Sequence, residues 1–152
     1  MSFTIRNVAI ALGALVLVGT AHLPAPSDLV GAWAPDAYIL SDGTKHTVDG
    51  RIFFTESEWL VLFFVLDGDE PRRGSGEGGS YELEGDRLTF SHLYHLSAGA
   101  EMPGLPDSPL RMEARQTGGP TEQTRIELED ERMTLHFPSG NAMTFRRTSA
   151  SR

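Results

Sequence analysis

Apolar and polar residues alternate along most of the chain after residue 29, and turn residues interrupt the alternation about every ten residues. Because successive side chains of a strand point to opposite faces, this pattern is typical of short antiparallel strands. No segment after residue 21 combines a 3.6-residue apolar stripe with helix caps, so helix is expected only near Asp28. The chain is therefore predicted to be all-β, with strands near residues 31–40, 51–55, 59–66, 80–84, 87–95, 110–115, 124–128, 132–137 and 142–147.

The connections between these strands are mostly of hairpin length. Four dipeptides offer residues that tolerate positive φ: Asp42-Gly43, Asp49-Gly50, Gly85-Asp86 and Gly140-Asn141. A single antiparallel up-and-down β-barrel of eight to nine strands is therefore favoured over a sandwich. Residues 67–79 and 96–108 form the two longer connections, and both are expected to be loops at the rim of the barrel.

The first 21 residues differ in composition from the rest of the chain. Arg6 precedes 11 apolar residues and glycines at positions 8–18, a length within the usual signal-peptide range of roughly 7 to 15 and short of the ~20 that span a bilayer. Small residues follow, and they favour signal peptidase cleavage between Ala21 and His22. We predict a signal peptide and an extracytoplasmic protein, periplasmic or secreted, without stable membrane insertion. A buried N-terminal helix is the alternative.

Charge and cysteine content exclude several classes of function. The chain has 0 cysteines, which excludes disulfides, thiolate metal sites and cysteine nucleophiles, so core packing must carry its stability. The net charge is −8, and removal of Arg6 with the signal peptide makes it −9. Nucleic-acid binding needs clustered basic residues, whereas the only basic doublets are Arg72-Arg73 and Arg146-Arg147. A nucleic-acid partner is therefore not expected.

Two short motifs lie at the ends of the predicted barrel. Residues 29–33 read Leu-Val-Gly-Ala-Trp, and residues 143–147 read Met-Thr-Phe-Arg-Arg. Together with the strand count, this pattern resembles the lipocalin-like (calycin) barrels, and the hairpin at residues 80–89 also resembles bacterial lipocalin-like proteins. In those families a Gly-x-Trp begins the first strand, and an arginine on or after the last strand packs on the tryptophan.

The resemblance implies roles for the ends of the chain and for the interior. Gly31 and Trp33, with either Arg146 or Arg147, are expected to close the barrel, because a guanidinium stacked on an indole adds a cation–π contact. The interior is expected to bind a small apolar or amphipathic ligand, and no cofactor is predicted. The predicted divisions are a signal peptide at residues 1–21, an extended lead-in at 22–28, the lipocalin-like barrel at 29–148 and a disordered tail at 149–152.

One predicted strand carries aromatic residues and a histidine on a single face. Phe90, His92 and Tyr94 alternate there, and a polar group among aromatic side chains would orient a mostly apolar ligand. A core filled by the same side chains is the alternative, because an eight-stranded barrel can be packed solid. The interior ligand-binding candidates are Phe54, Phe63, Phe90, His92 and Tyr94.

Patterns that would indicate catalysis or metal binding are weak. His92 and His95 are three apart on one predicted strand, so they are expected to face opposite sides and not to chelate one ion together. Residues 74–79 have the letters of a G-x-G-x-x-G motif, but they precede a strand and are interpreted as a flexible loop. No catalytic residue and no metal site is predicted. A barrel enzyme using His92 and Tyr94 is kept as the second alternative.

The predicted strand at residues 59–66 is apolar at every position. Such a strand either has a second face covered by a loop or presents that face to a partner. The main alternative to ligand binding is therefore a protein-interaction or inhibitor module that uses this strand and the rim loops. A protein partner or a homodimer would then bind through Leu60 to Leu66.

Overall fold

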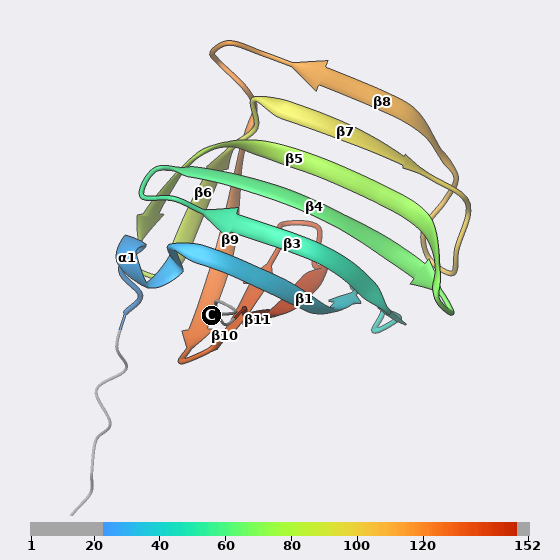
Figure 1. The fold of residues 1–152 in the computed structure, drawn as a ribbon, viewed down its shortest axis with the longest axis horizontal. Coiled ribbons are helices and arrows are strands. Elements are labelled where there is room, and N and C mark those ends of the chain that lie inside the picture. Colours follow the sequence, from blue (N-terminus) through green and yellow to red (C-terminus); the bar gives the residue numbers. More distant parts are fainter. Residues whose placement is uncertain (1–22, 149–152) are drawn as a thin grey trace, which may run out of the picture.

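The computed structural model describes residues 23–148, which form an all-β fold with one antiparallel sheet curled into a barrel (Figure 1). The predicted signal peptide, its cleavage site and the C-terminal tail lie outside these residues. The described elements are α1 (Pro26–Leu29), β1 (Gly31–Ile39), β2 (Lys45–His46), β3 (Val48–Phe54), β4 (Glu58–Asp67), β5 (Glu70–Glu84), β6 (Arg87–Ser91), β7 (Tyr94–Gly99), β8 (Ser108–Ala114), β9 (Thr121–Glu129), β10 (Arg132–His136) and β11 (Ala142–Arg147). Within residues 23–148, no helix is long and apolar enough to cross a membrane.

Eight strands close the barrel in chain order. They are β1, β3, β4, β5, β6, β9, β10 and β11, and the circle is completed where β11 pairs with β1. This arrangement confirms the predicted antiparallel up-and-down barrel. The short β2 pairs with β1, while β7 and β8 extend the sheet from β5 beyond the barrel.

The alternating sequence places one face of each barrel strand in the core. In β3, for example, Ile52 and Phe54 are 2% and 3% exposed, whereas Phe53 between them is 46% exposed. Burial of each large apolar side chain contributes about 1.5 to 3 kcal/mol to folding. The buried cluster comprises Leu29, Trp33, Ile52, Phe54, Trp59, Val61, Tyr81, Leu88, Phe90, Ile126, Met133, Leu135, Met143 and Phe145.

An arginine of the last strand packs on Trp33 where β11 pairs with β1. Arg147 is the arginine that stacks, with its guanidinium carbon 4.1 Å from the centre of the Trp33 ring. Arg147 also donates hydrogen bonds to the backbone carbonyls of Val30 and Asp28. A side chain at Gly31 would lie 3.2 Å from that guanidinium, which explains the glycine of the motif. The neighbouring Arg146 does not contact Trp33 in this way and instead forms an ion pair with the carboxylate of Asp36.

The prediction that residues 67–79 form a loop is wrong. The glycine-rich stretch at 74–79 belongs to β5, a strand of 15 residues that pairs with β4 along one edge. Its glycines make room for neighbouring side chains: a Cβ at Gly78 would lie 2.9 Å from the Cδ1 atom of Leu60. The same glycines that indicate flexibility in the sequence therefore allow close packing on the outer face of the sheet.

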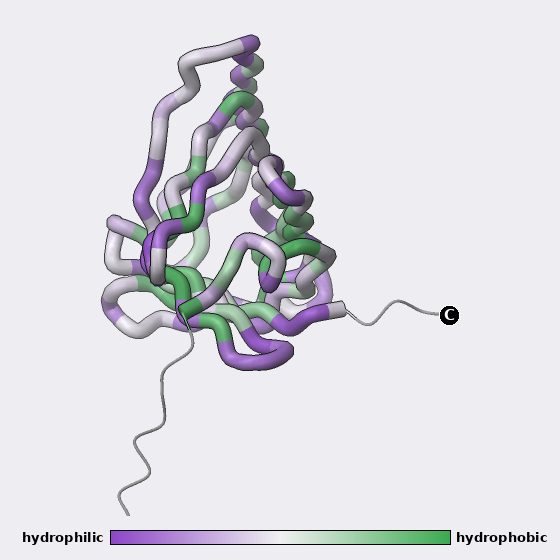
Figure 2. The backbone as a smooth tube through the Cα atoms, turned by 90° about the vertical axis from the view of Figure 1, so that its left-hand side faces the viewer, coloured by the Kyte–Doolittle hydropathy of each residue, from purple (hydrophilic) through white to green (hydrophobic). Residues whose placement is uncertain are grey.

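The prediction of one continuous strand over residues 87–95 is also wrong. β6 ends at Ser91, the chain bends at His92 and Leu93, and β7 then pairs with the first half of β5, while β6 pairs with its second half. The bend brings Ser91 against β5, because a Cβ at Gly79 would lie only 1.9 Å from the Ser91 carbonyl oxygen. The expected rim loop at 96–108 is shortened accordingly, and the extension of β7 and β8 rises above the barrel (Figures 1 and 2).

Candidate ligand cavity

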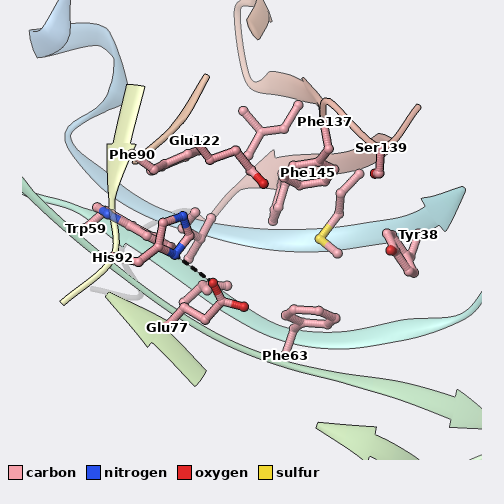
Figure 3. Close-up of a pocket in the computed structure, with 14 residues that line it drawn as sticks. Tyr38, Trp59, Phe63, Glu77, Phe90, His92, Glu122, Phe137, Ser139 and Phe145 are labelled. Carbon is pink, nitrogen blue, oxygen red and sulfur yellow. Dashed lines mark ion pairs between the residues drawn. The ribbon is translucent and has the colours of Figure 1, made fainter. Parts of the chain in front are cut away.

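The barrel interior contains a cavity of about 230 Å³ (Figure 3). This volume is somewhat below the roughly 300 to 1,000 Å³ of typical pockets for drug-sized ligands, so the cavity suits a smaller molecule. Most of its lining is apolar or aromatic and comes from barrel strands. The apolar and aromatic lining residues are Tyr38, Ile52, Trp59, Val61, Phe63, Phe90, Leu135, Phe137, Met143 and Phe145.

Polar side chains gather at one side of this cavity, where β5 faces the bend between β6 and β7. Nδ1 of His92 lies 2.9 Å from Oε2 of Glu77, and the two residues point toward each other in Figure 3. Ser75 donates a hydrogen bond of 3.0 Å to Oε1 of the same carboxylate. Nδ1 of His95 lies 3.5 Å from Oε1 of Glu77, and its Nε2 lies 2.9 Å from the Ser97 hydroxyl. Glu77 is therefore the centre of a connected polar network.

The network shifts the pKa values of both members of the ion pair. Burial acts to raise the pKa of Glu77, but hydrogen bonds from His92 and Ser75 and the nearby histidine charges outweigh it and lower that pKa. The hydrogen bond to Glu77 raises the pKa of His92, burial opposes this, and the charges of Glu77 and Glu122 add to the increase. The pair is thus stabilised in its charged form.

A second carboxylate reaches the cavity from β9. Glu122 lines the cavity, and Figure 3 shows its carboxylate directed into the space between Phe90, Phe145 and Glu77. It accepts a hydrogen bond of 3.2 Å from the hydroxyl of Thr124, which is fully buried. Across residues 23–148, no basic side chain forms an ion pair with Glu122.

The structure places three of the five predicted interior residues in the cavity wall: Phe63, Phe90 and His92. Phe54 lies inside the barrel but belongs to the packed core, where it stacks on Phe90 at 6.3 Å between ring centres. The expectation that Tyr94 faces inward is wrong, since Tyr94 lies opposite Gly78 and is 55% exposed. The bend after Ser91 changes the alternation on which that expectation depended.

The same bend overturns the expectation that His92 and His95 point apart. Both histidines contact Glu77, which pairs with His95 across β5 and β7. Glu77 and Glu122 were not indicated by the sequence patterns. Glu77 lies in the glycine-rich segment interpreted as a loop, although Ser75 and Glu77 alternate with glycines at the period of a strand.

Comparison with known proteins supports the fold. No family model and no curated protein matches this sequence. The crystal structure of a lipocalin-like protein from Bacteroides uniformis is similar with a TM-score of 0.50 and 18% sequence identity, over 80% of this chain and 99% of that chain. The crystal structure of an uncharacterized protein from Bacteroides eggerthii has a TM-score of 0.48 and 19% identity, over 79% and 99% of the two chains. With its closed eight-stranded barrel and the Trp33–Arg147 closure, the chain has a lipocalin-like β-barrel fold.

Proposed function

We propose that this protein is an exported barrel that binds a small, mostly apolar ligand in its interior. The observation that carries the proposal is the 230 Å³ cavity, which combines aromatic and aliphatic walls with a polar network on one side. Apolar walls supply affinity through burial of ligand surface, and a few fixed polar groups set its orientation. The lipocalin-like fold is consistent with this role.

The binding part of the proposal is tested with 1-octanol as a probe. Trp59 lines the cavity, so saturable binding is expected to change its fluorescence. The buried Val61, 8% exposed, faces the interior, and its replacement in a Val61→Phe variant fills space that the probe needs. We expect this variant to weaken octanol binding by about tenfold or more, which corresponds to about 1.4 kcal/mol.

Leu62 provides the matched control, because it follows Val61 on β4 but is 48% exposed on the outer face. The Leu62→Phe variant makes the same kind of change outside the barrel and should bind octanol as the unmodified protein does. Circular dichroism establishes that both variants are folded. Equal effects of the two substitutions, or no saturable binding in any of the proteins, would contradict interior binding.

The export part of the proposal rests on the sequence of residues 1–21. The full chain is expressed in a Gram-negative bacterium, and the N-terminus of the product is determined by mass spectrometry. We expect a product that begins at His22 and is recovered outside the cytoplasm. An uncleaved product confined to the cytoplasm would contradict export.

A further inference from the structure

The charges around the cavity are unbalanced. Glu77 and Glu122 both line it, and His92 is the only basic side chain among its described lining residues. His92 forms its ion pair with Glu77, at 2.9 Å, and the charge of Glu122 acts on the same imidazole, so one basic side chain serves both carboxylates. A carboxylate in a mostly apolar environment is costly to bury unless a positive charge or several hydrogen bonds compensate it.

The aromatic lining also suits a positive charge. Phe90 packs 4.4 Å from the centre of the Trp59 ring, and both rings lie on the side of the cavity where His92 and Glu122 are found. The face of an aromatic ring attracts a cation, and this attraction is stronger where water is excluded. Carboxylate and aromatic groups therefore favour the same kind of ligand atom.

From these two observations we infer that the ligand is an amphipathic amine, with an apolar body against the aliphatic and aromatic walls and a protonated nitrogen beside Glu122. The inference rests on the interior binding proposed above and specifies its ligand class. Glu122 acts here as the group that determines specificity. The Glu77–His92 pair forms the adjoining wall and keeps Glu77 from competing for the same cation.

Three probes share an eight-carbon chain and differ in their head group: octylamine, 1-octanol and sodium octanoate. Comparing them separates a preference for amines from interior binding of any apolar molecule. Near neutral pH we expect octylamine to bind about tenfold or more tightly than 1-octanol, because a hydrogen bond to a charged group contributes about 1.5 to 3 kcal/mol. Octanoate should bind most weakly. Equal affinities for the three probes would overturn the inference while leaving interior binding intact, and a failure of all three would overturn interior binding.

A Glu122→Gln variant tests the named residue. The glutamine keeps the size and hydrogen-bonding capacity of the side chain but removes its charge, so the preference for octylamine over octanol should fall to near equality. Glu129→Gln is the matched control, because Glu129 is an exposed residue of the same strand and loses the same charge. An unchanged preference in Glu122→Gln, or an equal loss in Glu129→Gln, would overturn the assignment.

A second and independent observation concerns the free edge of β8. This strand pairs with β7 alone among the described strands, and the Arg115 amide donates to the Leu93 carbonyl at 2.8 Å. Because backbone groups alternate in direction along a strand, Leu110, Met112 and Ala114 turn their N–H and C=O groups to the open edge. Unpaired edges of this kind readily pair with another strand.

The sequence of β8 is complementary to itself in one register. An antiparallel pair related by a two-fold axis through Met112 places Arg111 opposite Glu113 of the second copy, and Leu110 opposite Ala114 of the second copy. Opposite charges that face each other across strands stabilise a pair by about 0.2 to 1 kcal/mol at each position. The exposed side chains of Leu110 and Met112, 60% and 70% accessible, would lie on one face of this pair, with Met112 beside its equivalent and Leu110 beside Ala114 of the second copy.

We propose that two copies of the chain associate through β8 in this register. The proposed contact lies at the edge strand, whereas the sequence predicts a homodimer contact at residues 60–66. Light scattering after size-exclusion chromatography should give a dimer whose population rises with protein concentration. A monomer at every concentration would overturn the proposal.

The predicted register can be tested by reversing the charges of Arg111 and Glu113 on β8. Glu113→Arg places arginines opposite one another and should shift the equilibrium strongly toward monomer. The double exchange Arg111→Glu with Glu113→Arg restores opposite charges in the two-fold register and should restore the dimer. A dimer unaffected by Glu113→Arg, or no recovery in the folded double variant, would overturn the register.

Discussion

The Nδ1 atom of His92 lies 2.9 Å from Oε2 of Glu77, and this ion pair ties the bend between β6 and β7 to the middle of β5. Both side chains are mostly buried, with exposures of 18% and 23%. The contact therefore has two consequences. It fixes the bend on which the extension of β7 and β8 depends, and it forms one wall of the ligand cavity.

Stability is expected to depend on pH through this pair. The pKa of His92 is raised by its hydrogen bond to Glu77, so its contribution is complete below the ordinary histidine value of 6.5 and is lost as pH rises through the folded-state pKa. The pKa of Glu77 is lowered overall, so its contribution is present above 4.5 and is lost as pH falls through the folded-state pKa. The stabilisation is therefore largest between these two ordinary values.

Urea unfolding at about pH 6 and about pH 8.5 measures this dependence. The unmodified protein should lose more unfolding free energy between the two pH values than a His92→Gln variant, in which the titrating imidazole is absent. Glu77→Gln should reduce the dependence in the same direction, because the neutral amide no longer favours the imidazolium. The same pH dependence in all three proteins would contradict a stabilising role for the ion pair.

The contact between Trp33 and Arg147 is expected to stabilise the closure of the barrel. An Arg147→Met variant keeps much of the side-chain volume but removes the cation–π contact and the hydrogen bonds to Val30 and Asp28. We expect a loss of about 2 kcal/mol in unfolding free energy. In the control, Arg146→Met removes an ion pair to Asp36 from a side chain that is 63% exposed, and should cost less than about 1 kcal/mol. Equal losses would contradict a special role for Arg147.

Two glycines of β5 should respond differently to the same substitution. A Cβ at Gly79 would lie 1.9 Å from the Ser91 carbonyl oxygen, so Gly79→Ala forces the backbones apart and should cost at least about 2 kcal/mol in unfolding free energy. The closest atom to a Cβ at Gly76 is 3.7 Å away, and Gly76→Ala should be tolerated within about 1 kcal/mol. Urea unfolding measures both. A tolerated Gly79→Ala would contradict the close approach of β5 to the chain at Ser91.

Much of the barrel follows from local sequence features. Alternation predicts strands such as β3 and β10, because buried residues alternate with more accessible ones in each, and the resemblance carried by Gly31 and Trp33 implies that the first and last strands meet. The extension of β7 and β8 does not follow from alternation. A bend at two residues, His92 and Leu93, moves the following strand from the barrel to the edge of β5, and this pairing depends on contacts distant in sequence.

The sequence pattern predicts the aromatic residues that line the cavity, but it does not predict the acidic ones. Phe63 and Phe90 are large apolar residues at positions that face the barrel interior, which is where hydrophobic patterning places such residues. Glu77 and Glu122 also face inward, but a pattern that places apolar residues inside gives such positions no signal. Their inward position depends on the partners that the fold brings to them, His92 for Glu77 and Thr124 for Glu122.

Occupation of the barrel interior by a small ligand can be seen in a crystal structure of the protein soaked with 8-bromo-1-octanol. Anomalous scattering locates the bromine without reference to the rest of the electron density. We expect a bromine peak inside the cavity, among the side chains of Phe63, Met143 and Phe145. Interior binding would be contradicted if side chains filled the interior and no bromine peak lay there, with bromine found only on the outer face beside Leu60 and Leu62.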